Sequence, residues 1–225
     1  MRKANIKAVI FDMDGVLVDS EHVIEAAAVK ALKEYGVEAR PEDFIPFVGA
    51  GDDRYIGGVA EKYGLSYRKE MKERLYEIYL EILEDELGVF EGALPLLEIL
   101  KKEGYILALA SSADKIKVKA NLKAAGIPAE YFSCVFTGED VSEKKPSPEI
   151  YLKTAEKLAA RPGECVVVED ALNGIESAKS AGMVSVGVAA SFSAEELQKA
   201  GADYVCPDIS GVFDIIKTVD INGGI

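Results

Sequence analysis

The feature that most constrains the fold is a short apolar run, residues 6–11, which ends at the acidic sequence Asp12-Met13-Asp14-Gly15. The run is too apolar for a strand with one wet face. Its length and β-branched residues indicate a strand that is covered on both faces, as in a parallel α/β sheet. Ligands of such sheets bind beyond the carboxyl ends of the strands, so we expect Asp12 and Asp14 to project into a ligand crevice.

Two carboxylates one residue apart repel each other and lose hydration in such a crevice, and a bound cation would offset that cost. Mg2+ is the expected cation because it prefers oxygen ligands. A purely structural alternative is that Asp12 ends a strand and that Asp14-Gly15 forms a turn, since Asp-Gly pairs are frequent in turns.

Three further polar clusters follow later apolar runs, where three more strands are expected to end. They are Ser111-Ser112 after residues 105–110, Lys144-Lys145 after residues 134–137, and Glu169-Asp170 after residues 165–168. Each has a structural alternative, because the serines would also cap a helix beginning near Ala113 and the acids a helix over residues 171–181. Lys144 is interpreted as a surface charge. Four strand ends are therefore predicted to face one crevice.

The order of these motifs resembles the haloacid dehalogenase superfamily, over residues 8–189. The resemblance implies a Rossmann-like α/β fold, with a parallel sheet and helices on both faces. It also implies roles for the motif residues: nucleophile (Asp12), general acid and base (Asp14), hydrogen bond to the phosphoryl group (Ser111), neutralising cation (Lys145), and Mg2+ ligands (Asp12, Asp14, Glu169, Asp170). Dehalogenases of the superfamily lack an aspartate at the second position and transport ATPases carry threonine there, so Asp14 favours a phosphatase or a phosphomutase.

Between residues 19 and 89 the strand pattern gives way to helical periodicity, and residues 66–86 carry one apolar stripe at helical spacing. We therefore expect a helical cap over residues 19–89, inserted into a core made of residues 1–18 and 90–225. The insert resembles the small cap of the β-phosphoglucomutase-like subfamily. Such a lid excludes water and contributes contacts that select the substrate.

Candidate substrate contacts are Ser112 in the core and Gly49, Arg54 and Arg74 in the cap. Either arginine would suit a second phosphate or a sugar hydroxyl. The alternative for both is a surface ion pair with acidic residues that lie close in the sequence.

One position departs from the β-phosphoglucomutases, which carry a histidine on the first cap helix where this chain has Ile24. The only histidine, His22, lies two residues away and would point to a different face of that helix. This departure favours simple hydrolysis over a mutase reaction.

Charge and composition narrow the partners. The net charge of −13, from 26 basic and 39 acidic residues, makes nucleic acid a poor partner. An anionic substrate would then depend on local positive charge from Mg2+ and Lys145. The three cysteines are widely spaced and are expected to be buried thiols, and no targeting segment or bilayer-spanning run is recognised. We therefore expect a cytoplasmic protein without a membrane partner, monomeric by default, with higher oligomers left open.

Three hypotheses follow. The first is a Mg2+-dependent phosphatase that acts on a small phosphorylated metabolite, such as a sugar phosphate, through an aspartyl-phosphate intermediate. The second is a β-phosphoglucomutase-like phosphomutase. The third is a non-catalytic module that binds a phosphorylated ligand and regulates another process, although pure binding would not require Asp14.

Overall fold

A six-stranded parallel sheet lies at the centre of the computed structural model, which describes residues 6–48 and 50–222. The strand order is β5-β4-β1-β6-β7-β8. The strands are β1 (Ala8–Phe11), β4 (Ile106–Ala110), β5 (Cys134–Phe136), β6 (Cys165–Glu169), β7 (Val184–Val188) and β8 (Tyr204–Cys206). β1 pairs with β4 on one side and β6 on the other, so the order of the chain reverses beside β1 and a ligand crevice is expected at its carboxyl end.

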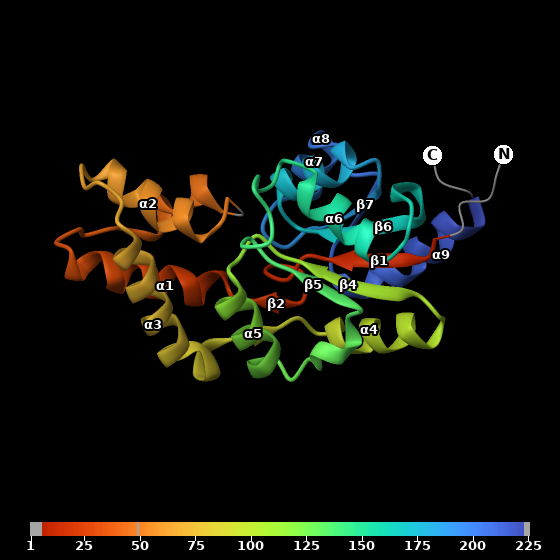
Figure 1. Ribbon diagram of the computed structural model, residues 1–225, viewed down its shortest axis with the longest axis horizontal. Coiled ribbons are helices and arrows are strands. Elements are labelled where there is room, and N and C mark those ends of the chain that lie inside the picture. The colour runs from red at the N-terminus through yellow and green to blue at the C-terminus, as the bar shows by residue number, and fades with distance from the viewer. Residues whose placement is uncertain (1–5, 49, 223–225) are drawn as a thin grey trace.

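Helices cover both faces of the sheet (Figure 1). One face carries α4 (Ala93–Lys102), α5 (Lys115–Ala124) and α9 (Val212–Asn222), and the other carries α6 (Glu149–Lys157), α7 (Leu172–Ser180) and α8 (Ala194–Lys199). Short 3-10 turns are η1 (Pro41–Asp43), η2 (Ile45–Phe47), η3 (Ala129–Tyr131), η4 (Pro162–Glu164) and η5 (Ile209–Gly211).

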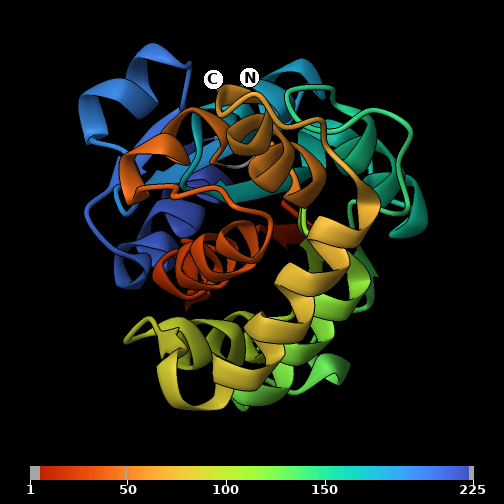
Figure 2. The same ribbon diagram turned by 90° about the vertical axis from the view of Figure 1, so that its left-hand side faces the viewer.

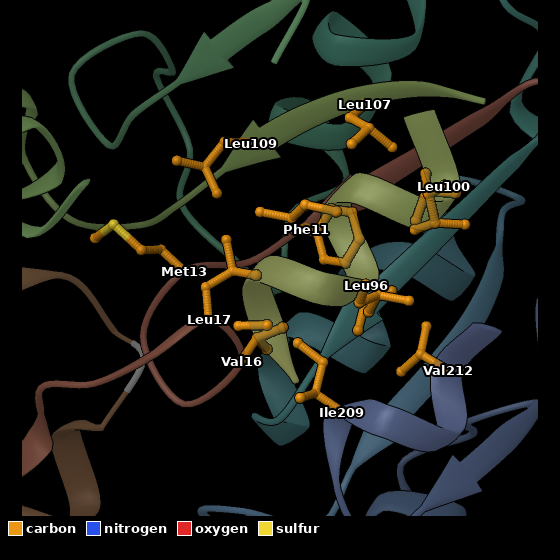
Figure 3. Close-up of a cluster of buried hydrophobic side chains, with 14 of the residues drawn as sticks. Phe11, Met13, Val16, Leu17, Leu96, Leu100, Leu107, Leu109, Ile209 and Val212 are labelled. Atoms are coloured by element: carbon orange, nitrogen blue, oxygen red, sulfur yellow. The ribbon is translucent and has the colours of Figure 1, made fainter. Parts of the chain in front are cut away.

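Successive residues of β1 pack into opposite halves of the core, which explains why the run carries no wet face. Val9 and Phe11 join the cluster under α4 and α9, part of which Figure 3 shows. Ala8 and Ile10 join the cluster under α6 and α7. All four side chains are fully buried. The predicted α/β fold with helices on both faces is confirmed.

The segment after β1 forms a separate helical layer at one end of the molecule (Figures 1 and 2). Its helices are α1 (Glu21–Glu34), α2 (Asp52–Lys62) and α3 (Lys69–Glu86). They share an apolar core that includes Leu32, Ile56 and Leu75. An antiparallel ribbon of β2 (Val18–Asp19) and β3 (Gly88–Val89), which the sequence did not indicate, connects this layer to the sheet. The predicted domain boundaries fall at this ribbon and stay predictions.

Within the described residues, none of the helices combines the length and the hydropathy needed to span a bilayer. All three cysteines carry free thiols, and two of them, Cys165 and Cys206, are buried. Burial raises the pKa of the Cys165 thiol to about 11, as expected for an inert core residue.

Candidate active site

Asp12 directly follows β1, at the carboxyl end of the central strand, and only 7% of the residue is exposed. Lys145 Nζ donates to Asp12 Oδ1 at 2.6 Å, to Glu169 Oε1 at 2.6 Å and to the carbonyl of Ala110 at 3.1 Å. Burial, together with the charges of Glu169 and Asp14, raises the pKa of Asp12 to about 7 against the opposing effect of Lys145. One ammonium therefore serves two buried carboxylates, and the site keeps an excess of negative charge.

Glu169 anchors Lys145, and its geometry disagrees with the expectation that it is a metal ligand. Oε1 accepts from Lys145 and from the Tyr151 hydroxyl at 2.9 Å. Oε2 accepts from the backbone N–H groups of Asp170 and Ala171, each at 3.0 Å. Because both oxygens already have two donors, Glu169 would have to give up hydrogen bonds to reach a cation.

Gly174 makes room for this arrangement. It lies in the first turn of α7, and a Cβ atom there would come within 1.9 Å of Glu169 Oε1. Glycine is unfavourable in a helix by about 1 kcal/mol relative to alanine, so the sequence alone offered no local reason for it. The close approach of the Glu169 carboxylate supplies the reason.

Asp170 lines the same cavity as Asp12 and is 4% exposed. Its carboxylate packs against the backbone of Gly15, where a Cβ would come within 1.9 Å of Oδ2, and that oxygen accepts from the Ser191 hydroxyl. Burial and the charges of Glu169 and Asp12 raise the pKa of Asp170 well above its ordinary value. Two crowded carboxylates, Asp12 and Asp170, thus line the same cavity.

The charge and the oxygen donors of this pair fit a divalent cation such as Mg2+. A site made of side chains alone is not present, because no three Asp, Glu, His or Cys side chains in residues 6–48 and 50–222 form a metal-binding group. The remaining ligands would have to be backbone carbonyls, water or substrate oxygen. That composition is usual for Mg2+, which commonly uses one or two carboxylates and keeps several waters.

Asp14 is held from both the core and the cap. Its Oδ1 accepts from the Ser20 hydroxyl, from Lys117 Nζ at 3.0 Å and from Asn121 Nδ2 at 3.2 Å. Lys117 and Asn121 lie one turn apart on α5 and are both buried, at 4% and 0% exposed. The sequence interpretation missed them; their spacing of four residues beside the apolar Val118 was the available signal.

The serines that follow β4 also line the cavity, and neither caps a helix as the structural alternative proposed. Helix α5 begins at Lys115 after Asp114, whose side chain accepts from Lys72 instead of capping. Ser111 Oγ accepts from the N–H of Ala113 at 3.1 Å. Ser112 Oγ is buried without a hydrogen-bond partner among the described residues.

The cavity has a volume of about 60 Å3 and is lined by residues of both the core and the cap. The cap residues that line it are Glu21, Ile24, Phe47, Val48, Gly51, Asp52 and Tyr55. Ile24 thus lines the same cavity as Asp12 and Asp14 with an apolar side chain. His22 points elsewhere, since its Nε2 contacts the carbonyl of Glu86 at 2.8 Å on the surface.

The two cap arginines are not among the residues that line the cavity, contrary to the substrate role considered for them. Arg54 pairs with Glu61 at 2.7 Å and stacks over Phe47. Arg74 pairs with Glu34 at 2.9 Å and with Glu77 at 2.8 Å. These contacts favour surface ion pairing over a substrate role, although the partners differ from those nearest in sequence. Gly49 lies outside the described residues.

The chain has relatives of known family. A sequence model of the family described as haloacid dehalogenase-like hydrolase matches residues 9–188. The chain is 42% identical over 212 residues to the chloroplastic protein SUPPRESSOR OF QUENCHING 1 of Arabidopsis thaliana, covering 92% of this chain and 20% of that protein. It is 34% identical over 213 residues to a phosphorylated carbohydrates phosphatase of Thermotoga maritima, covering 88% and 92%. The chain thus matches a fifth of the plant protein but nearly all of the bacterial phosphatase.

Solved structures of similar proteins share the fold of this chain. The crystal structure of β-phosphoglucomutase from Clostridium difficile has a TM-score of 0.84 and 26% identity, covering 96% of this chain and 98% of that chain. That of a hydrolase from Pseudomonas syringae has a TM-score of 0.82 and 29% identity, covering 94% and 98%. Because the family model spans most of the chain and the fold is shared throughout, the chain belongs to the haloacid dehalogenase-like hydrolases.

Proposed function

We propose that this protein is a Mg2+-dependent phosphatase that hydrolyses a small phosphorylated metabolite, such as a sugar phosphate. The observation that carries the proposal is the bridge of Lys145 between Asp12 and Glu169, in one cavity with Asp14 and Asp170. A nucleophile, a buried cation and a second carboxylate within one small cavity suit phosphoryl transfer, which depends on positioning and charge neutralisation.

In the first step an oxygen of Asp12 attacks phosphorus and forms an aspartyl phosphate while the bond to the leaving oxygen breaks. Asp14 gives its proton to that oxygen, so the product leaves as an alcohol. Lys145 neutralises charge on Asp12 and on the phosphoryl oxygens, and Ser111 donates a hydrogen bond to one of them.

In the second step water attacks the aspartyl phosphate, Asp14 takes the proton from that water, and the bond between Asp12 and phosphorus breaks. Mg2+, which the carboxylates of Asp12 and Asp170 would hold together with water or backbone oxygens, would supply charge stabilisation at the phosphoryl oxygens when bound. The cap excludes bulk water from the leaving group during the first step.

The test is phosphate release from p-nitrophenyl phosphate by the purified protein. We expect turnover with Mg2+, loss of turnover when a chelator removes the metal, and recovery when Mg2+ is returned. Asp12→Asn should abolish turnover while the protein stays folded. Full activity of Asp12→Asn would exclude the proposed nucleophile, and a flat screen of phosphate monoesters would favour a non-catalytic binding module.

A phosphomutase is the second candidate, because a solved β-phosphoglucomutase shares the fold over nearly the whole chain. The apolar Ile24 at the cavity disfavours it, since no histidine is available there to assist Asp14. A mutase would interconvert sugar phosphate isomers only when a bisphosphate primer is added, whereas the phosphatase releases inorganic phosphate without one.

A further inference from the structure

A contact between two helices links the cap to Asp14, the proposed general acid and base. Helix α3 of the cap packs against α5 of the core (Figures 1 and 2). The Tyr79 hydroxyl on α3 lies 2.6 Å from Asn121 Oδ1 on α5, and Asn121 Nδ2 lies 3.2 Å from Asp14 Oδ1. Tyr79 and Asn121 are both fully buried. A hydrogen-bonded path therefore runs from the cap through one core side chain to Asp14.

The direction of each hydrogen bond in this path follows from its chemistry. An ionised carboxylate can only accept, so the amide nitrogen of Asn121 must face Asp14. The amide oxygen then faces Tyr79, whose hydroxyl is the donor. Because both side chains are buried, a reversed amide would leave polar groups without partners, and that cost holds the observed orientation. The Tyr79 hydroxyl thus fixes which end of Asn121 is presented to Asp14.

The two carboxylate oxygens of Asp14 are not equivalent. Oδ1 accepts from Asn121, from the Lys117 ammonium at 3.0 Å and from the Ser20 hydroxyl. Within the part of the chain that the structure describes, no hydrogen bond or ion pair reaches Oδ2. Three donors already occupy Oδ1, so a proton carried by this carboxyl group belongs on Oδ2.

We propose that Lys117, Asn121 and Tyr79 are positioning residues that reserve Oδ2 of Asp14 for proton transfer to the leaving oxygen. The proton moves from Oδ2 to that oxygen as the bond between the oxygen and phosphorus breaks, and Asp14 is left as a carboxylate. Because Tyr79 belongs to the cap, the full set of contacts is present only while α3 packs on α5. This inference rests on the proposed phosphatase activity and on the role of Asp14 in it.

The test compares two esters of similar shape, phenyl phosphate and p-nitrophenyl phosphate, at fixed Mg2+. The p-nitrophenolate ion leaves readily without a proton, whereas the more basic phenolate gains more from protonation. The value of kcat/KM reports the step in which the leaving group departs and the aspartyl phosphate forms. The ratio of kcat/KM for the two esters therefore measures how well Asp14 delivers its proton.

Tyr79→Phe keeps the buried ring and removes only the hydroxyl. We expect kcat/KM for phenyl phosphate to fall by roughly tenfold to a hundredfold, because a displaced catalytic group loses about that much. For p-nitrophenyl phosphate the loss should be less than about threefold. Tyr67→Phe is the matched control, since it also removes a cap hydroxyl that donates to a carboxylate, that of Asp53. Neither Tyr67 nor Asp53 lines the catalytic cavity, so the ratio should keep its wild-type value.

Asn121→Leu tests whether Tyr79 acts through Asn121. Leucine has nearly the size of asparagine but makes neither hydrogen bond, so the ratio should shift at least as far as in Tyr79→Phe. Adding Tyr79→Phe to Asn121→Leu should then change the ratio by less than about twofold, because the path is already broken. If Asn121→Leu does not fold, the result for Tyr79→Phe decides the inference alone.

Equal losses for the two esters in Tyr79→Phe, or no loss for either, would overturn the inference, since a merely structural role lowers both alike. An equal shift of the ratio in Tyr67→Phe, or independent losses in the double variant, would overturn it as well. If the wild-type protein released phosphate from neither ester, the proposed phosphatase would be wrong, and the inference with it.

Discussion

Gly174→Ala should damage both stability and activity, although the same change in an ordinary helix is favourable by about 1 kcal/mol. The added carbon would lie 1.9 Å from Oε1, 2.0 Å from Cδ and 2.4 Å from Oε2 of Glu169. Either Glu169 or α7 must then move by well over an ångström. Such a movement would weaken the hydrogen bonds that Glu169 accepts from Lys145, Tyr151 and two backbone N–H groups.

The expected loss of stability follows from these contacts. Overpacking costs about 1–3 kcal/mol, and a hydrogen bond to a charged group contributes about 1.5–3 kcal/mol. After the gain in helix propensity, we expect a net destabilisation of about 2–4 kcal/mol, or roughly 5–15 °C in Tm. Because Lys145 loses its second anchor, kcat should fall by about a factor of 100.

Thermal unfolding of the metal-free protein and phosphate release from p-nitrophenyl phosphate measure the two effects. Gly163→Ala is the control, because a Cβ at Gly163 meets nothing within 4 Å. The control should keep wild-type activity and change stability by less than about 0.5 kcal/mol. A Gly174→Ala protein that is fully active and at least as stable as the wild type would refute the described packing of Glu169.

Three further outcomes are expected. Asp14→Asn should lower kcat by about 10^2 to 10^4, the usual contribution of one positioned proton donor, and a loss smaller than about tenfold would remove that role. Burial raises the pKa of Glu21 to about 7 from an ordinary value of 4.5. Between these two pH values the folded protein binds more protons at Glu21 than the unfolded chain does. Ionised Glu21 therefore destabilises the folded protein increasingly as the pH rises from about 4.5 to about 7. Glu21→Gln should therefore increase the free energy of unfolding relative to wild type more at about pH 8 than at about pH 5, by on the order of 2 kcal/mol. An equal effect at both pH values would contradict the burial of this charge. Arg74→Ala should retain catalytic activity within about a factor of two. It should change stability by less than about 1 kcal/mol, because the carboxylate partners of Arg74 lie on the surface. A large loss of kcat/KM would instead place Arg74 at the substrate.

The central strand and its acidic end could be predicted from local sequence, because a strand covered on both faces must be apolar throughout. The other strand ends followed for the same reason, and their polar residues Ser111, Lys145 and Asp170 do line one cavity. What local sequence could not give was the partner of each charge. A glutamate at this position could serve as a metal ligand. Only the fold shows that the carboxylate of Glu169 instead accepts hydrogen bonds from Lys145 and Tyr151.

Contacts between residues that are distant in the sequence account for the remaining differences between the predicted and the observed site. Lys117 lies in a lysine-rich segment that is typical of a solvated helix, yet it is buried where α5 meets Asp14 and the cap. Arg74 pairs with Glu34, which is distant in sequence but adjacent across two packed cap helices. The burial of Lys117 depends on how the cap folds over the core. The Arg74–Glu34 pair has no local signal, because it depends on how two cap helices pack against each other.

The most direct test of the central claim is a search for a phosphoryl group on Asp12. The protein would be mixed with Mg2+ and glucose 6-phosphate or p-nitrophenyl phosphate, quenched in acid during turnover, and digested for peptide mass spectrometry. We predict one phosphoryl group on the peptide that contains Asp12, labile to hydroxylamine and absent from Asp12→Asn. Turnover that leaves this peptide unmodified at every quench time, or that places the phosphoryl group on another residue, would contradict the claim.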